Sequence, residues 1–128
     1  MKKISLALTT AALFVACGSD ASHIHTLEVA EFEAAVEQQQ LPLVDVRTAD
    51  EYAEGHLNGA INIDVNQPDF IDKAALLTES KVAVYCLRGS RSLKAASQLA
   101  KHGVEVYNLA GGINAWKDAG KPITQDTP

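Results

Sequence analysis

The sequence has no surplus of basic residues, no internal repeat and no low-complexity tract. It has 11 Lys and Arg against 16 Asp and Glu, a net charge of −5. Removal of Lys2 and Lys3 with a leader would take this charge to about −7. Because binding to phosphate groups needs a basic face, we expect no nucleic acid as a partner. The composition, 47% hydrophobic and 21% charged, is typical of one globular domain.

The sequence also lacks a long apolar run. The uncharged stretch from Ile4 to Ala16 is too short to span a bilayer comfortably. Because Lys2 and Lys3 precede it, the stretch is typical of a secretory signal, and we expect residues 1–22 to be a leader and tether. About 105 residues remain, enough for one modest core. We expect one domain over 23–124, a tail over 125–128 and an exported, periplasmic protein.

The end of this leader has two interpretations. Residues 13–17, Leu-Phe-Val-Ala-Cys, resemble a bacterial lipobox, although Phe14 departs from the usual small or aliphatic residue. In that case Cys17 is lipidated and anchors the protein to a membrane through a tether over 18–22. The alternative is ordinary cleavage after Ala21, with Ser19 completing the small-residue pattern.

Cysteine is scarce, with only Cys17 and Cys86 in the chain. Under both interpretations Cys17 is acylated or removed, so Cys86 is the one thiol of the mature chain. An unpaired cysteine in an exported protein indicates an intermolecular or reactive role. The alternative is an inert, buried cysteine at the end of a strand.

The residues around Cys86 favour the reactive role. The apolar strand 82–85 ends on this cysteine, a loop with two arginines and a glycine follows, and a helical pattern covers 92–100. Such a turn can direct backbone N–H groups and a helix N-terminus at one sulfur atom, which stabilises the thiolate. We therefore predict that Cys86 is a nucleophile. Arg88 and Arg91 form a local positive site that suits a small anionic substrate.

Strand and helix patterns alternate along the rest of the chain. Thr48 and Glu51 form a capping box at the start of one short helix. The expected strands are 23–27, 41–47, 60–63, 82–85 and 104–109, and the expected helices are 30–39, 52–54, 70–77, 92–100 and 113–118. This alternation predicts an α/β fold with a parallel sheet covered on both faces. Cys86 lies at the carboxyl end of a strand, where such sheets bind ligands.

Four stretches in order resemble the single-domain rhodanese family of sulfurtransferases. They are Leu-Val-Asp-Val-Arg at 43–47 followed by Glu51 and Tyr52, Gly-His-Leu-Asn-Gly-Ala at 55–60, Cys-Leu-Arg-Gly-Ser-Arg at 86–91, and Leu-Ala-Gly-Gly-Ile-Asn-Ala-Trp at 109–116. The resemblance implies a rhodanese-like three-layer fold with about five short parallel strands. Asp64 stands where many relatives have proline, a change we expect to affect a turn rather than the chemistry.

The resemblance also implies a two-step sulfur transfer without a cofactor or metal. The Cys86 thiolate would attack the outer sulfur of a small anionic donor, thiosulfate or a persulfide. A thiol or cyanide acceptor would then take the sulfur from the Cys86 persulfide. The expected substrate-binding residues are those of the loop, Leu87, Arg88, Gly89, Ser90, Arg91 and Ser92, through their backbone amides.

The individual side chains have separate expected roles. Arg88 would pair with the sulfonate of the donor, and Arg91 would brace the loop through Asp45 or a nearby carboxylate. Asp45 and Arg47 are expected to support the site as a structural ion pair, with Arg47 reaching toward the pocket rim. His56 is expected to bond to local backbone.

Several other interpretations remain open or are set aside. A binding or redox-sensing module without turnover is one alternative. A phosphatase or arsenate reductase is less favoured, because phosphatase loops have five residues between Cys and Arg, whereas here there are four. His23 and His25 share one strand face but lie near a terminus, so we expect no metal site there. Gly111 and Gly112 are expected to allow a tight turn, with Trp116 in the core.

Overall fold

The computed structural model describes residues 19–78 and 80–125. Residues 1–18 of the predicted leader and tether, including Ile4–Ala16 and Cys17, lie outside the described residues, and so do residues 126–128 of the predicted tail. Export and lipidation therefore stay predictions. In the described part of the chain, no helix has both the length and the apolar content needed to cross a membrane.

The centre of the fold is a five-stranded parallel sheet in the order β1-β5-β4-β2-β3. The strands are β1 (Ile24–Leu27), β2 (Leu43–Asp45), β3 (Ile61–Asn62), β4 (Lys81–Tyr85) and β5 (Glu105–Leu109). The helices are α2 (Ser19–Ser22), α3 (Val29–Gln39), α4 (Ala49–Glu54), α5 (Phe70–Ala75), α6 (Ser90–Ala100) and α7 (Gly112–Asp118). The predicted α/β fold with about five parallel strands is confirmed.

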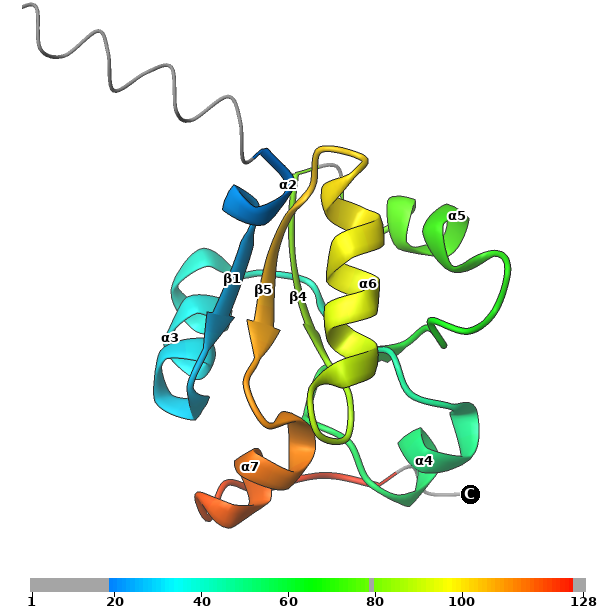
Figure 1. Cartoon of the computed structure of the whole chain (residues 1–128). Helices are drawn as coiled ribbons and strands as arrows, with labels where there is room; N and C mark the ends of the chain where they lie inside the picture. Colours follow the sequence, from blue (N-terminus) through cyan, green and yellow to red (C-terminus); the bar gives the residue numbers. More distant parts are fainter. Residues whose placement is uncertain (1–18, 79, 126–128) are drawn as a thin grey trace, which may run out of the picture.

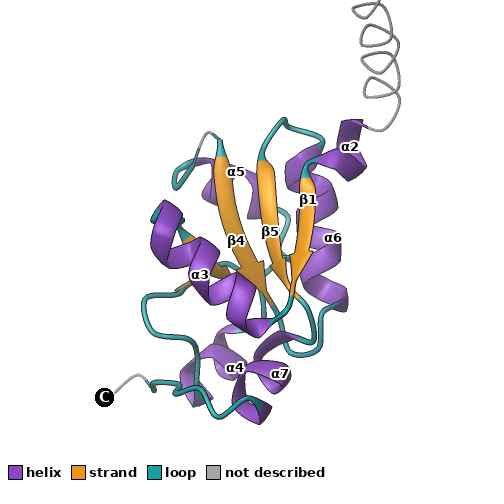
Figure 2. Ribbon diagram, turned by 90° about the vertical axis from the view of Figure 1, so that its left-hand side faces the viewer, coloured by secondary structure: helices purple, strands orange, loops and turns teal. Residues whose placement is uncertain are grey.

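Alternation along the strands divides the core between the two faces of the sheet. On one face, valines of β4 and β5 pack against α6 and α5, through residues such as Leu99 and Phe70. On the other face, Tyr85 and Leu109 pack against α3 and α7, through Phe32 and Ile113. Figures 1 and 2 show these helical layers on either side of the strands. The expected three-layer arrangement is confirmed.

Several predicted elements differ from the observed ones in length. The strand predicted over 41–47 is β2 (Leu43–Asp45), although single bonds continue its pairing at Pro42 and Val46. The helix predicted over 52–54 begins earlier, because Thr48 caps it and Ala49 is already helical. Residues 19–22, expected to belong to a short tether, form the short helix α2.

Candidate active site

Cys86 directly follows β4, at the carboxyl edge of the sheet, and its side chain lies on the α6 face. The backbone amide of Gly89 donates a hydrogen bond to Sγ at 3.0 Å. The thiol donates to Oγ of Ser92 at 3.5 Å, and the Ser92 hydroxyl in turn donates to the carbonyl of Gly89 at 3.1 Å. The loop therefore curls around the sulfur, as the sequence predicts.

Opposing effects act on the pKa of Cys86. Burial raises it, because the charged thiolate is poorly solvated. The hydrogen bond with the Ser92 side chain and those from the amides of Ser92, Gly89 and Arg88 lower it, and together they outweigh burial. The net pKa lies below the ordinary value of the thiol. The site thus favours a thiolate at lower pH than a free cysteine does.

The helix after the loop begins at Ser90, two residues earlier than predicted. Gly89 is its N-cap residue, with a left-handed φ of 118° and no side-chain capping bond. A glycine cap of this kind gives no side-chain signal in the sequence, which explains the error. As a result, Arg91 and Ser92 belong to the first turn of α6, whose positive N-terminal end faces the loop.

The six loop residues predicted to bind substrate do not all face the sulfur. The amides of Arg88, Gly89 and Ser92 act on Cys86. Leu87 is turned to the opposite face of the sheet, where it packs against the core cluster that contains Ile113 and Trp116. Ser90 is exposed at the start of α6. The amides of Arg88, Gly89 and Ser92 are therefore the members of the predicted set for which an effect on the thiol is shown.

The two loop arginines differ in their surroundings. Arg91 forms a bidentate pair with Glu51, with Nη1 and Nη2 at 2.7 and 2.9 Å from the two carboxylate oxygens. The contact fits the expected bracing role, and of the two expected partners, Asp45 or a nearby carboxylate, the second is found, because Asp45 is paired with Arg47. The guanidinium of Arg88 is exposed and has no hydrogen bond or ion pair with any described residue. Arg88 is therefore the arginine available to an anion from solvent.

Glu51 connects the loop to the start of α4. Its carboxylate accepts bonds from the backbone N–H and hydroxyl of Thr48, both at 3.1 Å, which completes the predicted capping box. The Arg91 pair, followed by the Thr48 bonds, lowers the pKa of Glu51 to about 2. Because this folded pKa is depressed, the pair stabilises the fold above the ordinary carboxyl pKa, and the contribution is lost as pH falls through about 2.

A buried polar network lies beneath the loops. Asp45 is completely buried and accepts bonds from the Arg47 guanidinium at 2.6 and 2.9 Å and from the Tyr85 hydroxyl at 2.7 Å. Nη2 of Arg47 also donates to the carbonyl of Gly55 at 2.7 Å. Burial, followed by the Asp45 charge, raises the pKa of Tyr85, which therefore remains a hydrogen-bond donor. The expected ion pair is present and ties β2, β4 and the segment after α4 together.

The N-terminus of α7 holds the loop from the other side, a contact that the sequence reasoning missed. The amide of Ile113 donates to the Cys86 carbonyl at 2.9 Å, and that of Asn114 donates to the Leu87 carbonyl at 3.2 Å. Gly112 has a φ of 62°, and a Cβ there would lie 2.4 Å from the Leu87 carbonyl oxygen. The Gly-Gly pair before a helical pattern is the sequence signal of this contact, because glycine permits a close approach of another backbone segment.

The family follows from comparison with known proteins. The family model for the rhodanese-like domain matches residues 28–119. The chain belongs to the rhodanese-like domain family. The thiosulfate sulfurtransferase GlpE of Pseudomonas fluorescens is 39% identical over 89 residues, which cover 68% of this chain and 80% of that protein.

Other members show that the rhodanese-like domain occurs in more than one setting. A tRNA uridine(34) hydroxylase of Staphylococcus aureus is 39% identical over 93 residues, which cover 68% of this chain but only 29% of that protein. The crystal structure of a rhodanese-related protein from Thermoplasma volcanium has a TM-score of 0.70 at 26% identity, covering 80% of this chain and 99% of that one. Membership therefore establishes the domain and leaves the activity to be argued from the site.

Three other polar residues of this rhodanese-like domain that the sequence singles out have structural contacts. His56 Nδ1 lies 2.8 Å from the Tyr52 carbonyl, and its backbone bonds to Thr124. His25 lies 2.7 Å from Glu105. Within residues 19–78 and 80–125, no group of three or more His, Cys, Asp or Glu could hold a metal ion. Asp64 accepts from the Asn66 amide at 2.8 Å, so it forms a turn, as expected.

A hollow of about 260 Å³ lies beside the loop. Its lining includes Leu87, Ile113 and Arg47, so Arg47 reaches a pocket wall while remaining paired with Asp45. Cys86 itself exposes only 1% of its surface and does not line this hollow. The sulfur is thus covered by protein atoms in this structure and is not open to solvent, as a freely accessible nucleophile would be.

Proposed function

We propose that the protein is a sulfurtransferase in which Cys86 carries a sulfane sulfur as a persulfide. The observation that carries this proposal is the Gly89 amide, 3.0 Å from Sγ in a loop that lowers the pKa of the thiol. A site that stabilises a thiolate also stabilises the terminal anion of a persulfide, since both place negative charge on sulfur. The similarity to a thiosulfate sulfurtransferase supports the same activity.

The sulfur transfer proceeds in two displacement steps. An electron pair of the Cys86 thiolate forms an S–S bond to the outer sulfur of thiosulfate, and the S–S bond of thiosulfate breaks. Sulfite leaves with the electron pair of the broken S–S bond. In the second step a thiolate or cyanide acceptor bonds to the outer sulfur of the persulfide, and the Cys86 thiolate is released. No external oxidant or reductant is needed, and no general base is needed once the thiol is ionised.

The burial of Cys86 sets a condition on this mechanism. Because the residue is 1% exposed, the loop must shift before a donor reaches the sulfur. Gly89, whose amide contacts Sγ, is half-buried, and Arg88 and Ser90 are exposed. The required motion is therefore one of a surface loop rather than of the core, and it favours a donor whose reacting atom is a single terminal sulfur.

Intact mass spectrometry after incubation with thiosulfate tests the proposal. We expect the mature domain to gain the mass of one sulfur atom and to lose it on addition of cyanide, with release of thiocyanate. Cys86→Ser is the matched control and should gain nothing. The absence of any mass gain with thiosulfate and with a low-molecular-weight persulfide would favour a binding module without turnover. Hydrolysis of an aryl phosphate would favour a phosphatase.

The two loop arginines provide a second prediction. We expect Arg88→Ala to slow loading from thiosulfate by about tenfold, the effect of losing one charge-assisted bond, while loading from an alkyl persulfide, which carries no sulfonate, changes little. Arg91→Ala should slow both donors and lower the melting temperature, because it removes the pair with Glu51. Loading rates with both donors, together with thermal melts, check this. Equal losses on both donors in Arg88→Ala would contradict the assigned role.

A further inference from the structure

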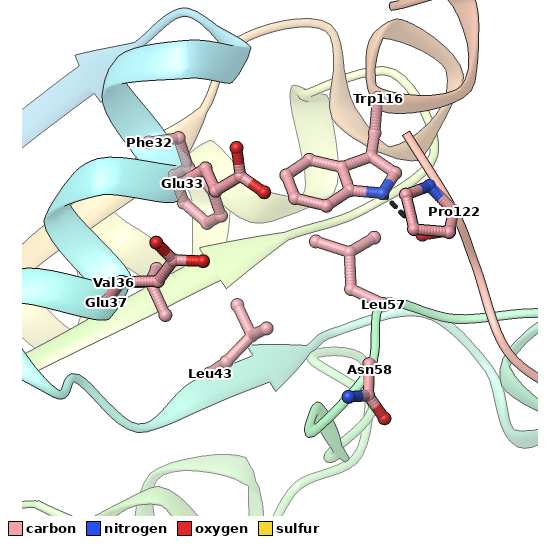
Figure 3. Close-up of a pocket in the computed structure, with 9 residues that line it drawn as sticks. All are labelled: Phe32, Glu33, Val36, Glu37, Leu43, Leu57, Asn58, Trp116 and Pro122. Atoms are coloured by element: carbon pink, nitrogen blue, oxygen red, sulfur yellow. Dashed lines mark hydrogen bonds between the residues drawn. The ribbon is translucent and has the colours of Figure 1, made fainter. Parts of the chain in front are cut away.

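A second hollow lies away from Cys86, between α3, β2 and α7, and has a volume of about 270 Å³. Figure 3 shows its apolar walls, which are formed by Phe32, Val36, Leu43, Leu57 and Trp116. Phe32 and Leu57 are 1% exposed, and Leu43 and Trp116 are 8% exposed, so the walls belong to the packed core. The indole N–H of Trp116 donates to the Pro122 carbonyl at 2.8 Å, which fixes the ring in place.

The charged groups on the rim of this hollow are two carboxylates. Glu33 and Glu37 lie one helical turn apart on α3, and Figure 3 shows both side chains on the side of the helix that faces the hollow. Glu33 is paired with Lys121 at 2.6 Å. The carboxylate of Glu37 is exposed and has no bond or ion pair with any residue in the described part of the chain.

The apolar walls and the unpaired carboxylate of Glu37 together indicate the kind of ligand that the hollow would bind. An apolar floor accepts a hydrocarbon body, and a carboxylate without a partner accepts hydrogen bonds from a cation. A primary ammonium offers three N–H donors and no acceptor, which matches the carboxylate of Glu37. The face of Trp116 adds an aromatic wall that attracts a cation or stacks against a ring. The volume lies just below the usual range of small-molecule sites and suits a body of about one ring.

We propose that this hollow binds a small primary amine with an aromatic body, with its ring against Trp116 and Leu57 and its ammonium at Glu37. The site is separate from the Cys86 loop, so the proposal does not depend on sulfur transfer. Lys121 opposes it, because its ammonium occupies Glu33 and repels a second cation. Removal of Lys121 should therefore strengthen binding.

Trp116 is the only tryptophan in the chain, so intrinsic fluorescence reports directly on the hollow. The probe is 2-phenylethylamine, and the comparison ligand is 3-phenylpropionate, which has a similar ring and chain but the opposite charge. We expect a saturable change in the fluorescence of the full chain with the amine and none with the acid. Equal titration by both ligands, or no saturable change with the amine, would overturn the proposal.

Three variants assign the binding to the carboxylate. Glu37→Gln should weaken the amine by about 1.5-fold to fivefold, the range for a solvent-exposed ion pair. Glu31→Gln is the matched control, since Glu31 is an exposed glutamate of the same helix outside the hollow, and it should leave the affinity unchanged. Lys121→Gln should tighten binding by a similar factor. An unchanged affinity in Glu37→Gln, or weaker binding in Lys121→Gln, would overturn the assignment.

Discussion

Replacing Gly112 with alanine is expected to destabilise the protein by about 2–5 kcal/mol, the combined cost of an overpacked contact and a left-handed backbone. The added Cβ would lie 2.4 Å from the Leu87 carbonyl oxygen and 2.5 Å from that of Cys86. Both atoms belong to backbone that cannot move without breaking the bonds from Ile113 and Asn114. Urea unfolding monitored by circular dichroism measures the loss.

Gly103→Ala is the matched control for this change. Gly103 also has a positive φ, 83°, but a Cβ there would meet no atom within 4 Å. It should therefore show only the backbone cost, about 1–2 kcal/mol. The difference between the two variants isolates the contact with the Cys86 loop. If Gly112→Ala and Gly103→Ala lose the same stability, the close approach of α7 does not constrain the loop.

Asp45→Asn is expected to cost about 3–5 kcal/mol, the range for breaking one side of a buried ion pair. The substitution preserves the shape of the side chain but leaves the Arg47 guanidinium, which is 4% exposed, without its counter-charge. It also removes an acceptor from the Tyr85 hydroxyl. The free energy of unfolding in urea is the measurement.

Two further variants test whether burial causes this effect. Asp69→Asn breaks the pair with Lys73, in which the side chains are 58% and 51% exposed, and should cost less than about 1 kcal/mol. Arg47→Met in the Asp45→Asn background should recover part of the loss, because no unpaired charge then remains buried. A double variant that is less stable than Asp45→Asn alone would show that Arg47 acts mainly through its bond to Gly55.

Features that depend on local sequence were predictable. The apolar strand before Cys86, the glycine within its loop and the Thr48–Glu51 capping box depend on residues that lie within a few positions of one another. The parallel sheet followed from the alternation of strands and helices. These local signals were sufficient to place the cysteine at the carboxyl edge of the sheet, where it is found.

Contacts between distant segments were not predictable from the pattern. Arg91 and Glu51 are 40 positions apart, and their pairing depends on how α4 docks beside α6. Glu51 also completes the capping box with Thr48, so the sequence gives no indication that it has a second partner. Its carboxylate has two oxygens and bonds to both Thr48 and Arg91. The Gly-Gly pair indicates a close backbone approach at Gly112, but the identity of the approached segment, the Cys86 loop, depends on the packing of α7.

Because all five strands are parallel, the chain enters the sheet at the end opposite to Cys86. The helix α2 and the start of β1 lie at one pole of the molecule, and the turn between β4 and α6 lies at the other (Figure 1). If the described domain is immobilised on a sensor chip through its Ser19 side, the thiol loop will face the flowing solution. Sulfur loading should then proceed as readily on the chip as it does in free solution.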